Sequence, residues 1–225
     1  MKAVITLEDT LPAKVEIEKA GARRTVYLNM QDLASHIVSS VKVEDIEDRP
    51  PEPEVILTSP SLPLNTVKYA KLSDDTDLLF MVYPESRNDV TYHNAVFTDV
   101  PFPNLVFCFK VKNNRLSASM LMAYKDRFLR EETQLFRFPF SNVFSDGNMC
   151  YHDNSVIHDL VQLQSFPYNW AKQPFNDHLF KQGENNLLNQ PLRELFEKSQ
   201  SQRFNYDMLR PMGMTFADWT NKILN

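Results

Sequence analysis

The hydrophobic pattern at the start of the chain predicts a small sheet followed by a helix. Short runs rich in β-branched residues at 3–6, 15–17 and 25–28 predict strands, and a turn over residues 19–22 joins the last two. Apolar residues then recur at helical spacing over residues 31–41, which predicts an amphipathic helix that needs a sheet to pack against. The chain therefore begins with a β-helix element, meaning strands and then one helix.

A second and stronger β pattern occupies the middle of the chain. Apolar runs over residues 78–83, 105–111 and 116–124 predict strands. Asn113 and Asn114 separate the last two runs, and asparagine tolerates the positive φ that a tight hairpin turn requires. We expect an antiparallel meander of about four strands.

Helical patterns follow this sheet. Apolar spacing predicts a short helix over residues 155–164 and another over 191–200, and Thr215 with Asp218 resembles a capping box that starts a last helix. The predicted fold class is α+β (α/β): the antiparallel meander is flanked by helices and preceded by the N-terminal β-helix extension.

An acidic, proline-containing stretch over residues 44–54 divides these two parts. Three prolines among acidic residues suit neither a helix nor a strand, so a solvated linker is the expected role. The predicted domains are residues 1–53, the extension with its linker, and residues 54–225, the main domain.

Composition excludes several kinds of function. The 225-residue chain carries 24 Lys+Arg against 29 Asp+Glu, so no general basic field attracts nucleic acid or anionic lipid. Neither a signal-peptide core nor an apolar run long enough for a membrane span is present, which predicts a cytoplasmic protein. With four glycines, a glycine-rich phosphate loop is not expected, and neither a nucleotide nor a metal cofactor is expected.

The two cysteines have different sequence surroundings. Cys108 lies in the middle of an apolar strand, where a thiol acts as a small hydrophobic side chain. Cys150 follows Asp146 and Gly147 in a turn-forming segment outside the predicted strands. Any thiol chemistry is therefore expected at Cys150.

The surroundings of Cys150 resemble a known signature. In ubiquitin-conjugating enzymes an asparagine precedes the catalytic cysteine by eight residues and a glycine precedes it by three, and Asn142, Gly147 and Cys150 have these spacings. Together with the strands before it, the run from Pro139 to Cys150 is similar to prokaryotic ubiquitin-conjugating family D, which includes the B component of plasmid-associated PRTRC systems. The resemblance is good over residues 80–153, weaker to about residue 180, and not visible in residues 1–50.

The resemblance implies a ubiquitin-conjugating (UBC)-like fold and a thioester carrier. Cys150 would be the nucleophile, as a thiolate, and the Asn142 amide would donate to the oxyanion of the transfer step. His158 is the preferred candidate for the acid or base that prepares the acceptor amine, ahead of four other residues. These are His152, Asp153, Asp177 and His178. The implied partners are a ubiquitin-like protein, an adenylating activating enzyme and a metal-dependent deconjugating peptidase.

The chain also departs from the eukaryotic signature. Phe140 and Ser141 stand where that signature has histidine and proline, and the histidine is understood to hold the asparagine loop. Tyr151 replaces the usual small or aliphatic residue after the cysteine. The sequence does not show what supports this loop instead.

Three other interpretations remain open at this stage. Cys150, His152, Asp153 and His158 could bind zinc, although their spacing is irregular. Cys150 with His158 could form a cysteine hydrolase, although no local signature of such a family surrounds the thiol. The missing His-Pro pair favours a third interpretation, a catalytically inactive UBC-like adaptor that binds a ubiquitin-like partner.

Overall fold

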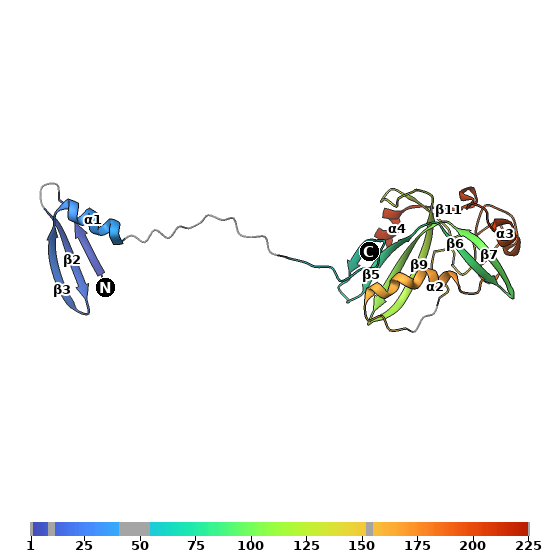
Figure 1. Ribbon diagram of the computed structural model, residues 1–225, viewed down its shortest axis with the longest axis horizontal. Helices are drawn as coiled ribbons and strands as arrows, with labels where there is room; N and C mark the ends of the chain where they lie inside the picture. Colours follow the sequence, from blue (N-terminus) through green and yellow to red (C-terminus); the bar gives the residue numbers. More distant parts are fainter. Residues whose placement is uncertain (1, 9–11, 41–54, 152–154, 225) are drawn as a thin grey trace. The chain divides into compact units, whose positions relative to one another are not determined.

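A computed structural model describes residues 2–8, 12–40, 55–151 and 155–224. The chain forms two compact units, residues 1–56 and 57–225, and each is described by itself (Figure 1). The linker expected at residues 44–54 lies outside the described residues, as do His152 and Asp153.

The first unit is a three-stranded antiparallel sheet with one helix. Its elements are β1 (Lys2–Thr6), β2 (Ala13–Lys19), β3 (Ala22–Leu28) and α1 (Met30–Ser40), and the strand order is β1-β2-β3. Positive φ at Ala20 and Gly21 forms the tight turn between β2 and β3. Only Ala13, Val15 and Leu33 are buried together, so the core of this unit is small.

The second unit is built on one antiparallel sheet of six strands. The strand order is β11-β10-β9-β8-β5-β4. The bounds are β4 (Thr66–Lys71), β5 (Asp77–Tyr83), β8 (Asn104–Lys112), β9 (Arg115–Tyr124), β10 (Gln134–Phe136) and β11 (Pro211–Thr215). The expected mixed α and β class with antiparallel strands is confirmed, but the sheet has six strands where about four were expected.

A separate hairpin lies between β5 and β8 in sequence and was not predicted. It consists of β6 (Ser86–Tyr92) and β7 (Ala95–Phe102), which pair only with each other. Charged and polar residues interrupt its apolar pattern, and the register shifts between Asn88 and Val90. A bulge of this kind breaks the period of two on which strand prediction depends.

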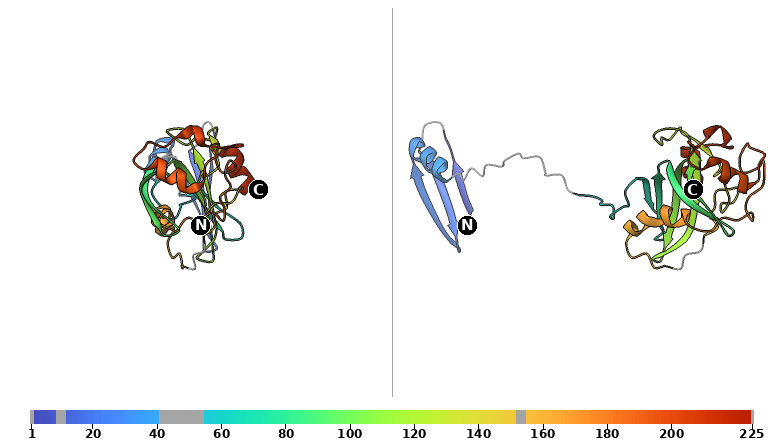
Figure 2. Two further views of the ribbon diagram at one scale, coloured as in Figure 1. Left: turned by 90° about the vertical axis from the view of Figure 1, so that its right-hand side faces the viewer. Right: turned by 45° about the vertical axis from the view of Figure 1, so that its right-hand side comes forward.

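Helices cover both faces of the six-stranded sheet. On one face η1 (Leu160–Ser165) continues directly into α2 (Phe166–Ala171), and this helix crosses the sheet (Figures 1 and 2). Phe166 and Trp170 pack against Phe107 of β8, and α3 (Leu192–Ser199) joins the same core. On the other face Trp219 of α4 (Phe216–Leu224) packs against Phe80. The remaining helical element is η2 (Tyr206–Met208).

Two helix starts test the sequence predictions. The capping box at Thr215 and Asp218 is confirmed, because each backbone N–H donates to the side chain of the other residue at 2.9 and 3.1 Å. The predicted start of a helix at residue 155 is wrong. Val156 forms a β-bridge with Arg115, and the helix begins only at Leu160, after the Asp159 cap.

No helix in the described part of the chain is both long and apolar enough to cross a membrane.

Candidate active site

Asn142 and Cys150 face each other at the base of a small hairpin. The Cys150 N–H donates to the Asn142 carbonyl at 2.9 Å, Val143 and Met149 form a β-bridge, and the Phe144 N–H donates to the Asn148 carbonyl at 2.8 Å. Each successive pair lies one residue closer to the tip. The eight-residue spacing between Asn142 and Cys150 is therefore the register of a hairpin with a three-residue loop.

The tip of this hairpin depends on Asp146 and Gly147. The Asp146 carboxylate accepts a hydrogen bond from the Asn148 N–H at 3.0 Å, and Gly147 adopts φ of +91°. A Cβ at Gly147 would lie 2.5 Å from Met122 Cε and 3.1 Å from the Leu121 carbonyl oxygen. Gly147 is therefore required by both the backbone conformation and the close contact with β9.

We expect Gly147→Ala to destabilise the second unit by about 1–3 kcal/mol, since it adds strain at positive φ and a clash with β9. Gly213→Ala is the matched control, because Gly213 also has positive φ but a Cβ there would meet nothing within 4 Å. Urea unfolding of both variants separates the two costs. Equal losses of unfolding free energy would show that the contact with β9 contributes nothing.

The hairpin is bonded to the edge of β9. The Leu121 N–H donates to the Gly147 carbonyl at 2.8 Å, and the Met149 N–H donates to the Ser119 carbonyl at 3.0 Å. These bonds lie on the side of β9 that does not pair with β8. The predicted strand thus provides the rigid support on which the Cys150 segment is held.

The Asn142 side chain has a structural bond of its own. Asn142 adopts φ of +67°, is 8% exposed, and its Nδ2 donates to the Pro174 carbonyl at 3.1 Å. The next residue, Phe175, exchanges backbone hydrogen bonds with Thr91 and His93 of the β6–β7 hairpin. One amide hydrogen of Asn142 is engaged in this way, and a primary amide has a second hydrogen to donate.

Two buried asparagines, Asn185 and Asn186, hold the backbone in front of Asn142. Both are 0% exposed, and their amides donate to the carbonyls of Phe140 at 2.7 Å and Pro139 at 3.0 Å. Their own side-chain oxygens accept from the N–H groups of Lys181 and Leu188. These residues supply the loop support that the missing His-Pro pair left unexplained.

The residues in the His-Pro positions are buried in the core. Phe140 packs against Phe102 and Phe196, and its side chain is an anchor without polar function. Ser141 is fully buried, and its hydroxyl has no hydrogen-bond partner among the described residues. The sequence gave no sign of Asn185 and Asn186, because a buried amide and a surface amide look alike in a sequence.

We expect Asn185→Ala to lower the unfolding free energy by about 1–3 kcal/mol, because the Phe140 carbonyl would remain buried without a donor. Asn189→Ala, which changes an exposed asparagine of the same loop, should alter stability by less than about 0.5 kcal/mol. Chemical denaturation measures both values. Similar small losses in the two variants would contradict the supporting role of Asn185.

The two thiols differ in access. Cys150 is exposed, whereas Cys108 is buried in the second apolar cluster of the sheet. Burial raises the pKa of Cys108 to about 12, so this thiol stays protonated at neutral pH. Next to Cys150, the Tyr151 ring packs against Phe166 of α2 with ring centroids 4.7 Å apart.

Iodoacetamide should therefore modify Cys150 in the native protein and leave Cys108 unmodified until the protein unfolds. Peptide mass spectrometry after a labelling time course at pH 7–8 distinguishes the two sites. A parallel series in urea shows when Cys108 becomes accessible. Slow labelling of both thiols at the same rate would contradict the difference in access.

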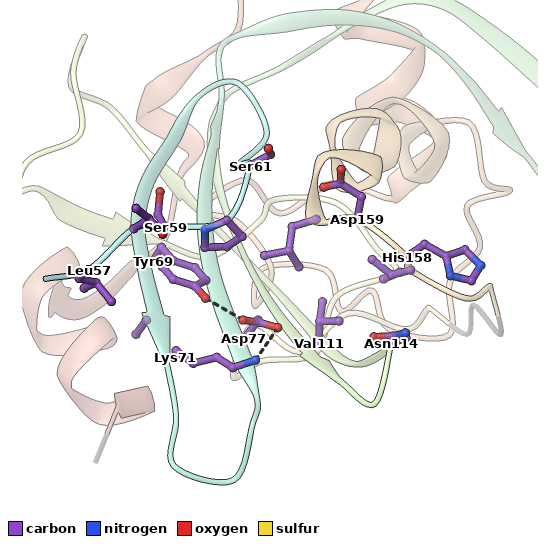
Figure 3. A pocket seen from close by; sticks show the side chains of 15 residues that line it. Leu57, Ser59, Ser61, Tyr69, Lys71, Asp77, Val111, Asn114, His158 and Asp159 are labelled. Atoms are coloured by element: carbon purple, nitrogen blue, oxygen red, sulfur yellow. Dashed lines mark hydrogen bonds and ion pairs between the residues drawn. The ribbon is translucent and has the colours of Figure 1, made fainter. Parts of the chain in front are cut away.

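His158 lies in a different place from the hairpin base. The Ile157 N–H donates to the Asn114 carbonyl at the β8–β9 turn, and the helical turn expected to direct His158 toward Cys150 is not formed at residues 155–158. His158 instead lines a cavity of about 800 Å³ whose lining includes neither Asn142 nor Cys150. Figure 3 shows its ring pointing away from Tyr69 and Asp77, which are hydrogen-bonded across the cavity at 2.8 Å.

The remaining candidate acids and bases are distributed around a second loop. The Asp177 carboxylate accepts from the Tyr92 hydroxyl at 2.7 Å and lies 3.3 Å from His93 Nε2. Burial and this carboxylate raise the pKa of Tyr92 to about 12. The backbone N–H of His178 donates to the Asn176 side chain. Asp177 is thus three residues from the carbonyl that Asn142 binds.

The zinc interpretation can be examined only in part. His152 and Asp153 lie outside the described residues. Among the residues that the structure does describe, no three His, Cys, Asp or Glu side chains are grouped as metal ligands.

An antiparallel sheet with helices on both faces, and an exposed thiol beside an asparagine at its edge, define an α+β protein compatible with an E2-like fold. Residues 58–216 match the family model of prokaryotic E2 family D, and the chain belongs to this family. The family expected from the sequence is thus confirmed. The chain matches no curated protein and no solved structure.

Proposed function

We propose that this protein is a ubiquitin-conjugating-type carrier enzyme. The Cys150 thiolate attacks the thioester carbonyl at the C-terminus of a ubiquitin-like protein, and the thiol of an adenylating activating enzyme leaves. An acceptor amine then attacks the new thioester, loses a proton, and displaces the Cys150 thiolate. The observation that carries the proposal is an exposed Cys150 held beside Asn142 by hairpin register in a member of an E2 family.

The proposed roles of the other groups follow from their positions. The free amide hydrogen of Asn142 would donate to the oxyanion of the transfer step, and Asn185 and Asn186 would keep the Asn142 loop in place. His158 remains the proposed acid or base from the sequence, and its place in another cavity means that it would act only after a local rearrangement.

The proposed setting is a cytoplasmic conjugation system. Its partners would be the ubiquitin-like protein, the activating enzyme and a metal-dependent deconjugating peptidase, without nucleic acid or membrane. Within the chain, residues 54–225 would be the catalytic domain and residues 1–53 an extension. The energy for the reaction would arrive as a preformed thioester, so no cofactor is proposed on this chain.

One observation favours the second candidate, a catalytically inactive adaptor. Asn142 is 8% exposed and already donates to Pro174, so its amide has a purely structural use as well. In this case the protein would bind the ubiquitin-like partner without forming a thioester. The two candidates predict the same complex but different covalent chemistry.

A loading assay separates them. The full chain is mixed with its ubiquitin-like protein, the activating enzyme and ATP, and the products are separated on gels with and without a thiol reductant. A reductant-sensitive adduct mapped to Cys150 by mass spectrometry supports the carrier enzyme. Binding without an adduct, when the activating enzyme forms its own thioester in the same tube, supports the adaptor.

A further inference from the structure

The first unit does not form a sufficient core by itself. Ala13, Val15 and Leu33 are its buried apolar residues, and residues 1–56 contain no cysteine that could form a disulfide. Domains of about 40 residues or fewer usually need disulfides, metals or oligomerisation for stability. No group of metal ligands occurs among its described residues. Association with another surface is therefore the remaining source of stability.

Apolar side chains remain uncovered on the face of this sheet that carries α1. Ile5 lies opposite Val15 in the β1–β2 register, so it points to the same face as the core, yet it is 44% exposed. On α1, Ile37 follows buried Leu33 by one turn and is 45% exposed, and Val38 is 75% exposed. The α1 helix therefore covers only part of the apolar face.

The edge of β1 has none of the usual protection against pairing. β1 is bonded to β2 alone, its register runs from Lys2 to Thr6 without a bulge, and residues 3–6 contain no charge and no proline. By contrast β4, an edge of the larger sheet, has a register shift between Thr66 and Lys68. Unprotected edges of this kind form hydrogen bonds with another strand.

We propose that β1 pairs with β1 of a second copy of this chain. Antiparallel pairing about a two-fold axis would place Val4 opposite the partner's Val4, Ala3 opposite the partner's Ile5, and Lys2 opposite the partner's Thr6. No like charges meet in this register. Residues 1–40 contain five Lys+Arg and five Asp+Glu, so their net charge is zero and two copies do not repel each other.

The dimer would extend the sheet of the first unit to six strands, with both α1 helices on one face. Ile5 and the exposed end of the α1 stripe would then be covered by the same groups of the other copy, as a two-fold interface requires. The proposal does not rest on the thioester chemistry, since it involves the first unit alone.

Sedimentation or light scattering across the micromolar range tests the proposal with the full chain. The expected mass is twice the 26.2 kDa of one chain. Ile5→Lys should raise the dimer dissociation constant at least about tenfold, because it buries a charge in the interface. The control Tyr27→Lys changes a residue that is 64% exposed and opposite Lys14, on the other face, and should leave the mass unchanged. A monomer at all concentrations overturns the proposal.

A cross-linking test does not depend on how well Ile5→Lys folds. In a Cys150→Ser background, Val4→Cys should form a disulfide-linked dimer on mild oxidation, since the two residues would be directly opposite each other. Thr6→Cys should not, because its copies would be offset by about 13 Å along the strands. Equal cross-linking of the two variants, or none of either, overturns the proposed register.

Discussion

Cys150→Ala is expected to abolish the reductant-sensitive adduct with the ubiquitin-like protein completely. The reason is chemical, because alanine has no nucleophile and the other thiol, Cys108, is buried with its pKa raised to about 12. The measurement is a non-reducing gel of the loading reaction over time. The unfolding free energy should change little, since Cys150 is exposed.

Two further variants make this result specific. Cys150→Ser should give a slowly formed adduct that withstands reductant, because the serine hydroxyl forms an oxygen ester in place of the thioester. Cys108→Ala should load as the unchanged protein does. An adduct that persists in Cys150→Ala and disappears in Cys108→Ala would refute the assignment of the nucleophile.

Asn142→Gly is expected to slow transfer to an acceptor amine by about 10²–10³-fold while loading continues. Glycine is the suitable replacement, because Asn142 has φ of +67° and glycine adopts this conformation without strain. The variant therefore removes the amide and leaves the backbone. Single-turnover discharge of preloaded protein to free lysine measures the rate.

The lost bond to Pro174 must be separated from lost catalysis. Removing this bond should cost about 1 kcal/mol of stability, which urea unfolding reports independently of the rate. Asn148→Ala is the matched control, because Asn148 lies in the same hairpin and its amide donates to Asp146. A discharge rate within about tenfold of the unchanged protein would leave Asn142 a structural role only.

Local patterns in the sequence predicted much of the sheet and the pairing of Asn142 with Cys150. The predicted strands at 78–83, 105–111 and 116–124 correspond to β5, β8 and β9, since buried strands are read from continuous apolar runs. The Asn113–Asn114 turn has φ of 51° and 57°, as expected for asparagine. These features depend on neighbouring residues and are visible in a sequence.

Features that depend on distant contacts were not predictable in this way. Asn185 lies 45 residues from the carbonyl that it binds, and the pairing of Val156 with Arg115 replaces a helical turn that the apolar spacing favoured. Likewise, the placement of His158 follows from its attachment to the β8–β9 turn. Tertiary hydrogen bonds decided each of these cases against or beyond the local pattern.

The segment that carries Cys150 also closes the edge of the sheet. Along the side of β9 that does not pair with β8, bonds come from β10, from the hairpin at Gly147 and Met149, and from Val156. A strand edge stripped of these partners is a template for aggregation. Mutations that loosen the hairpin should therefore reduce the yield of soluble protein along with its chemistry, so that poor expression and lost activity have one physical origin.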